Sequence, residues 1–355
     1  MSFSLFRSAR PMWSGTATAL AAALVLVLAT GVTNANAATS SSASANTTSK
    51  IPAGTVINFG DQQQDLETLL DSSGALKGAP YKVNFVEFNS GPLVDAGFAA
   101  HSIDVGMMGD LPASLAAQSK LPVKAVAVYL PVGASEYLLA KPGITKISQL
   151  KGKPVAYTTG TAEQAFALRA LASAGLTQKD VTQVNVSLLQ LGTVLESGAA
   201  DASVVSVEQK VDYQQTNPGA KVLATVESVK PPSYGYVLAS TAALGNPAKQ
   251  AAISDLTGRL VKAANWEKTH QSQFITDYYV NVEHQTPAAA KQILAAGGIS
   301  DYVPITPAVQ SALQSVVKLM ASAGAIPSTY SVASLFDQAV TARYNTVLKE
   351  VPTND

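Results

Sequence analysis

The chain has 355 residues, of which 47% are hydrophobic and 14% charged, a composition typical of a compact globular protein with room for two domains. Lysine plus arginine and aspartate plus glutamate both number 24, so there is no basic excess of the kind that nucleic-acid binding requires. The chain contains no cysteine, which excludes disulfides, cysteine nucleophiles and cysteine-based zinc sites.

Residues 1–37 have the pattern of a signal peptide. Two arginines precede an uncharged apolar run at 17–29, and an A-x-A cleavage pattern ends at Ala37. An uncleaved membrane anchor is the alternative, although the run is short for a span of about 20 residues. We therefore predict cleavage after Ala37, export without a lipid anchor, and a flexible leader of Ser, Thr and Ala over 38–53.

From residue 55 onward, short β-branched or aromatic runs alternate with helix-like segments. The runs that predict strands lie at 55–60, 81–88, 103–108, 123–130, 136–141, 154–159, 181–187, 202–207, 221–226 and 236–241. The first predicted helices lie at 64–72, 92–100 and 111–119. This alternation predicts parallel sheets covered by helices on both faces. After Pro247 the pattern is almost entirely helical, with amphipathic stripes in 249–280 and 307–326.

Two segments of the chain share the same succession of residue types. Both 93–108 and 194–207 contain an acidic helix end, a glycine two residues on, a pair of alanines, and an aspartate before a strand. Two strand-helix-strand units of this kind fit two similar α/β lobes.

Four predicted strands end in short turns rich in glycine and neutral polar residues, at 60–64, 89–92, 109–112 and 160–163. In open α/β sheets, ligands bind at the carboxyl ends of strands, where helix N-termini converge and free N–H groups favour anions. Glycine admits ligand atoms close to the backbone, and Gln, Asn, Ser and Thr supply neutral hydrogen bonds. Together these turns indicate a ligand site.

Each turn also has a purely structural explanation. Ser90, Asp110 and Thr161 are suitable helix N-caps, and Thr161 with Gln164 fits a capping box. Pro92 suits the first turn of a helix. Capping alone therefore accounts for any one of these turns, and only their grouping favours a ligand.

Motifs for catalysis and cofactor binding are missing from the sequence. It has no P-loop, no Rossmann fingerprint and no G-x-S-x-G pattern. His101 and Asp104 could supply two metal ligands, but no third partner is near in sequence. Glu136, Glu163 and Glu208 could act as general acids, although nothing in their spacing indicates it. We predict no catalytic site, no metal site and no cofactor.

Three segments carry a recognisable pattern: EFNSGPLVDAGFAAHSIDVGMMGDLPASLAAQ (87–118), ISQLKGKPVAYTTGTAEQAFALRALASAGLTQKDV (147–181) and LESGAADASVVSV (195–207). They contain a Gly-Pro entering a helix, D-x-G followed by G-D-x-P, L-K-G-K-x-V-A before a Gly-Thr turn, and A-G-L before K-D-V. In these features the chain resembles the aliphatic sulfonate, taurine and nitrate family of ABC-transporter substrate-binding proteins.

The resemblance implies an α/β, two-lobed periplasmic-binding-protein fold of type II, with two crossovers and a helical C-terminal tail. Lobe one would comprise 54–135 plus 236–345 and lobe two 136–235, with 346–355 as the tail, and the lobes would close on the ligand.

The same resemblance implies a monomeric, non-enzymatic protein of the periplasm. It would capture a small-molecule ligand, sulfonate-like in character, and deliver it to an ABC permease with its cytoplasmic ATPase. Nitrate and a neutral heterocycle, such as a thiamine pyrimidine precursor, remain open as ligands. An enzyme on the same scaffold is a further alternative, but related enzymes rely on cysteine or histidine, which the predicted turns lack.

By motif position, ligand contacts carry over to residues in the four turns and on the second crossover: Gln62, Gln63, Ser90, Gly91, Met108, Gly109, Asp110, Thr159, Gly160, Thr161 and Tyr234. Where many family members have Trp-Asp-Pro-Tyr, this chain has Ser-Val-Glu-Gln, which could bring Glu208 to the ligand. No turn contains Lys or Arg, so N–H groups and neutral side chains would hold a sulfonate, and the charge of the ligand stays open.

Overall fold

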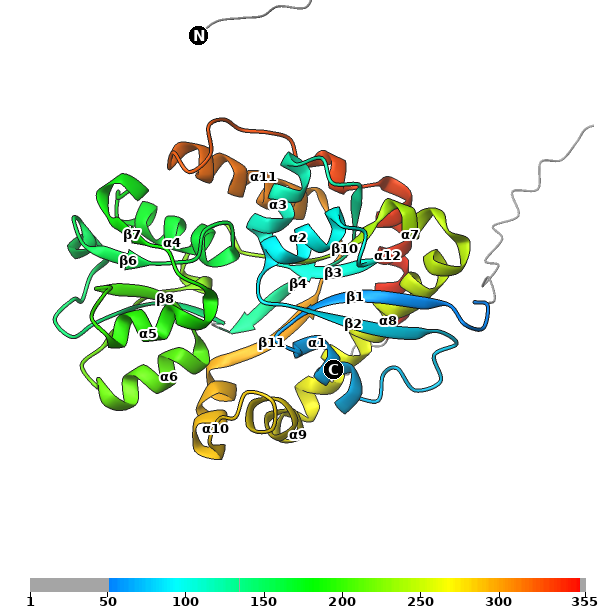
Figure 1. Cartoon of the computed structure of the whole chain (residues 1–355), viewed down its shortest axis with the longest axis horizontal. Coiled ribbons are helices and arrows are strands. Elements are labelled where there is room, and N and C mark those ends of the chain that lie inside the picture. The colour runs from blue at the N-terminus through cyan, green and yellow to red at the C-terminus, as the bar shows by residue number, and fades with distance from the viewer. Residues whose placement is uncertain (1–50, 134, 352–355) are drawn as a thin grey trace, which may run out of the picture. The chain divides into compact units, whose positions relative to one another are not determined.

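The computed structural model describes residues 51–133 and 135–351 (Figure 1). The predicted signal peptide and most of the predicted leader lie outside the described residues. Within the described part, no helix has both the length and the apolar character needed to cross a membrane.

The first sheet has six strands in the order β11-β4-β10-β3-β1-β2. They are β1 (Val56–Gln62), β2 (Lys82–Phe88), β3 (Val105–Met108), β4 (Val123–Gly133), β10 (Gly235–Ser240) and β11 (Gly297–Tyr302). Strand β1 runs parallel to β2 and β3, whereas β10 lies antiparallel between β3 and β4.

The second sheet has five strands in the order β7-β6-β8-β5-β9. They are β5 (Glu136–Ala140), β6 (Pro154–Ala156), β7 (Thr182–Val184), β8 (Ala202–Ser206) and β9 (Lys221–Thr225). Strand β6 runs parallel to β7 and β8, and β5 is antiparallel to both of its neighbours, β8 and β9.

The chain passes from one sheet to the other twice, between β4 and β5 and between β9 and β10. This is the two-lobed α/β arrangement with two crossovers that the sequence predicts. The expectation of purely parallel sheets is wrong, because β5 and β10, the strands that enter each sheet after a crossover, run against their neighbours. The two similar segments at 93–108 and 194–207 fall one in each sheet, leading into β3 and β8.

Helices cover both faces of the first sheet. Helices α2 (Gly91–Ala99) and α3 (Asp110–Gln118) lie on one side, and α1 (Asp65–Ser72) and α8 (Pro247–Thr269) lie on the other (Figure 1). The second sheet carries α4 (Ala162–Ser173), α5 (Leu191–Glu196) and α6 (Val207–Thr216). The remaining helical elements are α7 (Thr241–Gly245), α9 (Gln271–Phe274), a π-helical turn (Ile275–Val280), α10 (Pro287–Ala296), α11 (Pro307–Ser322) and α12 (Gln338–Glu350).

Strand β11 lies in the region that the sequence predicts to be helical, so that expectation is wrong for 297–302. The segment begins with two glycines, which are poor helix formers. Its backbone pairs antiparallel with the long strand β4, and this pairing outweighs local propensity.

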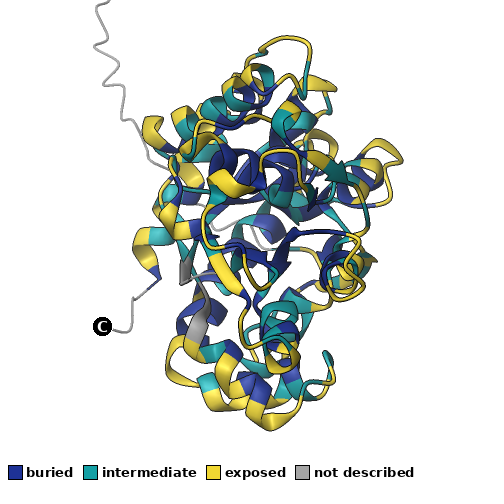
Figure 2. Ribbon diagram, turned by 90° about the vertical axis from the view of Figure 1, so that its left-hand side faces the viewer, coloured by how far each residue is buried: buried dark blue, intermediate teal, exposed yellow. Residues whose placement is uncertain are grey.

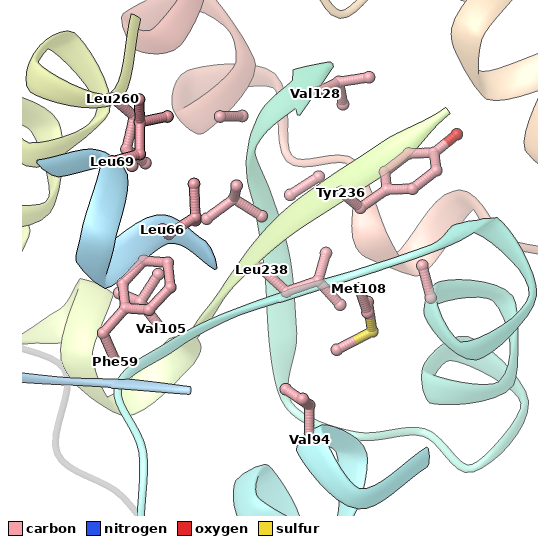
Figure 3. Packing of buried hydrophobic residues seen from close by; sticks show 14 of the residues in the cluster. Phe59, Leu66, Leu69, Val94, Val105, Met108, Val128, Tyr236, Leu238 and Leu260 are labelled. Atoms are coloured by element: carbon pink, nitrogen blue, oxygen red, sulfur yellow. The ribbon is translucent and has the colours of Figure 1, made fainter. Parts of the chain in front are cut away.

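Buried apolar residues form two clusters: the first spans the first sheet and the face of the second sheet that α5 and α6 cover, and the second lies on the opposite face of the second sheet, under α4. Dark blue, buried positions follow the strands and the inner faces of the helices, and exposed positions lie on the outer turns (Figure 2). Figure 3 shows the first cluster, in which Phe59, Leu66 and Leu260 pack together from β1, α1 and α8. Removing each such side chain from water stabilises the fold by about 1.5–3 kcal/mol.

Helix α11 belongs to both cores. Its predicted apolar stripe is buried as expected, with Leu313 and Val317 in the first cluster and Val316 and Met320 in the second. The helix packs on α3 and on α4, so it ties the two lobes together along one side.

Candidate functional site

A cavity of about 290 Å³ lies where the strand ends of the two sheets face each other. It is lined by the ends of β1 and β4, the first residues of α2, α4 and α6, the segment before β10, and the π-helical turn. Seven of the predicted ligand residues line it: Gln62, Gln63, Gly91, Gly109, Thr161, Glu208 and Tyr234.

Three helices begin at this cavity with N-termini that no side chain caps. They are α2, which starts at Gly91, α3, whose N-cap is Gly109, and α4, which starts at Ala162. Helix α6 differs, because the Ser206 hydroxyl accepts a hydrogen bond from the Gln209 N–H at 3.3 Å. Uncapped first-turn N–H groups carry partial positive charge and suit an anion.

The predicted capping box of Thr161 and Gln164 does not form. The Thr161 hydroxyl donates to the Thr158 carbonyl at 2.8 Å, and Gln164 Oε1 accepts from the Gly160 N–H at 2.8 Å. Gly160 has φ of +82°, which glycine adopts without strain, and this turn offers Gln164 a donor one residue earlier than expected. The expectation that Ser90 caps α2 is also wrong, because its hydroxyl makes no cap hydrogen bond.

Asp110 is not the N-cap of α3 that the sequence predicts, but the first residue of the helix. Its side chain is 2% exposed and forms an ion pair with Arg169 of α4, while the Ser233 hydroxyl donates to the same oxygen at 2.9 Å. Asp110 therefore lies behind the cavity wall and links both lobes and the second crossover. The sequence signal for Arg169 is weak: one arginine in the otherwise apolar stretch AFALRALA.

The other predicted residues outside the lining have partners of their own. Met108 is fully buried in the first core (Figure 3). The Thr159 hydroxyl accepts from Gln183 Nε2 at 2.9 Å, and its N–H donates to Asn185 Oδ1 at 2.9 Å. Asp104, considered above as a metal ligand, pairs with Lys249 at 2.7 Å, and the described residues contain no group of three or more acidic or histidine side chains suited to a metal.

The turn between β1 and α1 is strained where it meets the cavity. Gln63 and Gln64 both have φ of +58°, a left-handed conformation that side-chain-bearing residues rarely adopt. Asp61, which is fully buried, holds this turn by accepting from the N–H groups of Leu66 and Glu67. Gln62 Nε2 donates to the Met107 carbonyl at 2.9 Å, which fixes one side of the cavity.

Four carboxylates line the cavity: Asp65, Glu136, Glu163 and Glu208. None of the described residues that line it is a lysine, arginine or histidine. Burial raises the pKa of Asp65 to about 7, with a further rise from the charges of Asp61 and Glu208. Burial also raises the pKa of Glu136 well above its usual range, and that of Glu163 and Glu208 in the same direction. Asp65 is not among the predicted ligand residues, because the sequence places it inside the predicted helix at 64–72 rather than in a turn.

Four tyrosines also line the cavity: Tyr129, Tyr234, Tyr278 and Tyr279. The π-helical turn presents Tyr278 and Tyr279 together, with ring centroids 5.0 Å apart at a T-shaped angle of 68°. The Tyr129 ring lies directly over Gly235, where a Cβ atom would come within 1.9 Å of ring carbon Cζ. Of these four tyrosines, the sequence predicts only Tyr234 as a ligand residue. The other three come from segments in which no local motif indicates that they lie near the predicted turns.

The fold and the cavity between its lobes define a protein of the periplasmic-binding-protein class, and comparison with known proteins places it more narrowly. Residues 77–265, a little over half of the chain, match the NMT1/THI5-like family, and the protein belongs to that family.

Two curated relatives are named as aliphatic sulfonates-binding proteins. The one from Escherichia coli is 28% identical over 151 residues, covering 41% of this chain and 47% of the relative. The one from Bacillus subtilis is 26% identical over 215 residues, covering 60% of this chain and 64% of the relative. The chain thus spans about half to just under two thirds of the length of these relatives.

Solved structures confirm the predicted fold. The periplasmic aliphatic sulphonate binding protein SsuA from Escherichia coli has a TM-score of 0.71 at 20% identity, covering 81% of this chain and 93% of that one. The alkanesulfonate-binding protein SsuA from Xanthomonas axonopodis pv. citri, bound to MOPS, has a TM-score of 0.72 at 22% identity, covering 81% and 99%. The neighbours are mainly binding proteins, but the desulfurization enzyme DSZB shares the fold with a TM-score of 0.56 at 12% identity, covering 82% and 99%.

Proposed function

We propose that the protein is an extracytoplasmic solute-binding protein that captures a small sulfonate-like organic compound and delivers it to an ABC permease. The observation that carries this proposal is the convergence of three uncapped helix N-termini, those of α2, α3 and α4, on one cavity between two lobes. A sulfonate has three acceptor oxygens, and these N–H groups can bind it without a basic side chain. The names of the two relatives and of the structural neighbours agree with this solute class.

We place the lobes at 54–135 plus 236–345 and at 136–235, with the two crossovers as the hinge. Apart from Gly235, the strands of the two sheets fall on opposite sides of these bounds, which supports them. The helix N-termini at the cavity come from both lobes: α2 and α3 belong to the first and α4 to the second. A ligand that binds all three therefore favours the closed arrangement of the lobes. Export by a cleaved signal peptide, the lack of a lipid anchor and a monomeric state are part of the proposal.

We also propose binding without turnover. The cavity lining contains carboxylates, tyrosines and neutral groups, and the chain has no cysteine to serve as a nucleophile. An assay of the purified protein with an aryl sulfinate tests this point, since consumption of that compound would make the protein an enzyme.

The decisive test of the solute class is a thermal-shift screen of the purified protein against alkanesulfonates, aminoalkanesulfonates, aryl sulfonates, nitrate and pyrimidine precursors of thiamine. At a concentration one hundred times its Kd, a true ligand adds about 2.7 kcal/mol to the free energy of unfolding. We expect this stabilisation from at least one sulfonate. Stabilisation by a pyrimidine alone, with none by any sulfonate, would replace the proposed solute with the neutral heterocycle.

A further inference from the structure

We propose that the buried ion pair between Asp110 and Arg169 separates by exchange of partners, so that the lobes can part without leaving either charge unpaired. When the lobes part, Asp110 accepts a hydrogen bond from Tyr236 of its own lobe. Arg169 then pairs with Glu136 of its own lobe. This inference rests on the proposed function only because it takes the lobes to open and close, and it does not depend on which solute binds.

The ion pair joins the two lobes through a buried contact. Asp110 is the first residue of α3 in the first lobe, and Arg169 lies on α4 in the second. Their side chains are 2% and 1% exposed. Parting of the lobes draws these two groups away from each other, whereas each keeps the neighbours of its own lobe. A buried charge that loses its counter-charge is strongly destabilising, so the pair would hold the lobes together unless each charge finds another partner.

The first lobe contains a second hydrogen-bond donor for Asp110. Tyr236 of β10 lies opposite Met108 of β3, two residues before Asp110. The Tyr236 side chain is fully buried, and in the described part of the chain neither its hydroxyl nor Asp110 Oδ1 has a hydrogen-bond partner. Figure 3 shows this hydroxyl pointing away from Leu238 and Met108. Burial raises the pKa of Tyr236 well above its usual range and the charge of Asp110 raises it further, so the hydroxyl keeps the proton that it would donate.

The second lobe contains a second acceptor for Arg169. Two nitrogens of the guanidinium, Nε and Nη1, have no hydrogen-bond partner among the described residues. Helix α4, which carries Arg169, packs on β5, and Glu136 is the first residue of that strand. Glu136 is half-buried and lines the cavity, and its Oε2 is a buried atom to which no described group donates. Donors and an acceptor that lack partners therefore lie within one lobe.

The carboxyl of Glu136 changes its protonation in the exchange. Burial raises the pKa of Glu136 well above its usual range, the charges of Glu163 and Asp110 raise it further, and the charge of Arg169 lowers it. While Asp110 is paired with Arg169, the neutral form of Glu136 is therefore favoured. Withdrawal of Asp110 removes one of the raising charges and leaves the guanidinium to stabilise the carboxylate. Glu136 then gives up its proton and becomes the counter-charge of Arg169.

A permanent ion pair does not account for this arrangement of unpartnered atoms. Buried polar groups in a fixed network normally have their hydrogen bonds satisfied. Here the only side-chain hydroxyl that donates to Asp110 is that of Ser233, at 2.9 Å, from the second crossover. The crossover connects the lobes, so this bond can persist when they part. The bond to Arg169 cannot, and each lobe contains one group suited to replace it.

The distance between the lobes provides the test. The chain has no cysteine, so spin labels can be attached at chosen positions. Asp212 of α6 and Lys291 of α10 are exposed and lie on helices of opposite lobes that pack together. Double electron–electron resonance on the ligand-free, full-length protein with Asp212→Cys and Lys291→Cys gives the ratio of short to long distances. That ratio measures how far the lobes favour contact.

Tyr236→Phe and Glu136→Gln should each raise the ratio of short to long distances, because each removes a partner that only the parted lobes use. We expect an increase of about threefold for Tyr236→Phe and about tenfold for Glu136→Gln, where the lost partner is charged. Glutamine resembles the neutral form of Glu136, so this variant should leave the arrangement with the lobes in contact nearly unchanged.

The chain offers a matched control for each variant. Tyr157 is fully buried and its hydroxyl has no partner in the described part, but burial alone raises its pKa. Tyr157→Phe therefore removes a buried hydroxyl without touching the ion pair. Glu196 is exposed at the end of α5, and Glu196→Gln removes a carboxylate from the same lobe as Glu136. Both controls should leave the ratio of distances unchanged.

The outcomes separate this inference from the proposed function. An unchanged ratio in Tyr236→Phe and Glu136→Gln, or a shift toward the long distance, would overturn the exchange of partners and leave the thermal-shift test of the solute unaffected. A shift in one variant alone would overturn the exchange in the lobe of the other. The expected shifts in a protein that no sulfonate stabilises would support the exchange and remove the sulfonate from the proposed function.

Discussion

Asp65 and Asp110 occupy equivalent places in the fold and have different surroundings. Each is the first residue of a helix that follows a strand of the first sheet, α1 after β1 and α3 after β3, and β1 and β3 are neighbours. Asp110 is 2% exposed and paired with Arg169 of the second lobe. Asp65 has no ion-pair partner among the described residues, and the second lobe places Glu208 near it instead.

The opposite lobe therefore sets the role of an acidic residue at a strand end. Both carboxylates stand at the first position of a helix, although the residue before each differs in backbone conformation: Gln64 is left-handed and Gly109 is extended. An arginine opposite makes Asp110 an internal link between lobes, whereas a carboxylate opposite leaves Asp65 without a counter-charge among the described residues. We call the Asp110–Arg169 pair with the Ser233 hydroxyl the clasp.

The largest expected effect comes from removing one half of the clasp. Three atoms of the pair, Arg169 Nε and Nη1 and Asp110 Oδ1, have no hydrogen-bond partner among the described residues, so the pair as a whole adds little net stability. Arg169→Met nevertheless leaves a carboxylate buried without its counter-charge, and we expect a loss of about 3–5 kcal/mol in the free energy of unfolding. Urea denaturation measures it.

An exposed ion pair provides the control for this substitution. Lys151 lies 3.9 Å from Asp180, and its side chain is 73% exposed, so Lys151→Met should cost less than about 1 kcal/mol. If Arg169→Met were as mild as Lys151→Met, the clasp would not be the buried charge pair described above, and the contrast between Asp110 and Asp65 would disappear.

Asp65→Asn should raise the free energy of unfolding of the ligand-free protein at pH 8, in contrast to the loss expected from Arg169→Met. The pKa of Asp65 is raised from 3.8 to about 7, so the folded protein holds this proton more tightly than the unfolded chain. The contribution of Asp65 to the free energy of unfolding is then greatest below about pH 4 and falls as the pH rises to about 7. The substitution removes that loss, and we expect the variant to exceed the unmodified protein by roughly 1–3 kcal/mol at pH 8 without ligand, and to match it at pH 4.

Urea denaturation of the ligand-free protein at both pH values measures this effect. Asp61, with its pKa raised to about 6, and Glu267, with its pKa raised to about 8, keep part of the pH dependence in the variant. Asp71→Asn, on the exposed face of α1, should change stability by less than about 0.5 kcal/mol at either pH. A variant less stable than the unmodified protein at pH 8 would mean that the Asp65 carboxylate stabilises the empty protein.

The sequence predicts the fold well wherever local pattern decides. All strands from β1 to β10 begin within two residues of the start of a predicted run, because β-branched and aromatic residues are enriched in strands. Strand direction and β11 depend on pairing between distant segments, such as β11 with β4, and no local pattern contains that information. The capping predictions for Ser90 and Thr161 are wrong: the Thr161 hydroxyl donates to the Thr158 carbonyl instead, and the Ser90 side chain makes no cap hydrogen bond.

The residues of the candidate site likewise fall into those that a local pattern predicts and those that only the tertiary structure brings to the cavity. Gly91, Gly109 and Thr161 reach the cavity through turn chemistry that the sequence displays. Tyr278 and Tyr279 reach it only because the chain returns from α8 to lie beside α1, and nothing in their own segment signals a cavity. The motif predicts that Met108 contacts the ligand, but the alternation of side chains along β3 decides which face it occupies. Met108, at the end of β3, is buried in the core and does not line the cavity.

The smallest effect that we predict concerns the contact between lobes next to the clasp. Gly109 has φ of −73°, so alanine fits its backbone, but a Cβ atom there would lie 2.6 Å from the Cβ of Ala162 in the other lobe. Gly109→Ala should therefore hinder closure and weaken solute binding about tenfold, or 1.4 kcal/mol, in calorimetry. Ala162→Gly alone should leave affinity nearly unchanged, and the double variant should recover it, since one methyl group then replaces the other. Failure of the double variant to recover affinity would show that Gly109 acts through the clasp residue Asp110, and not through the contact between lobes.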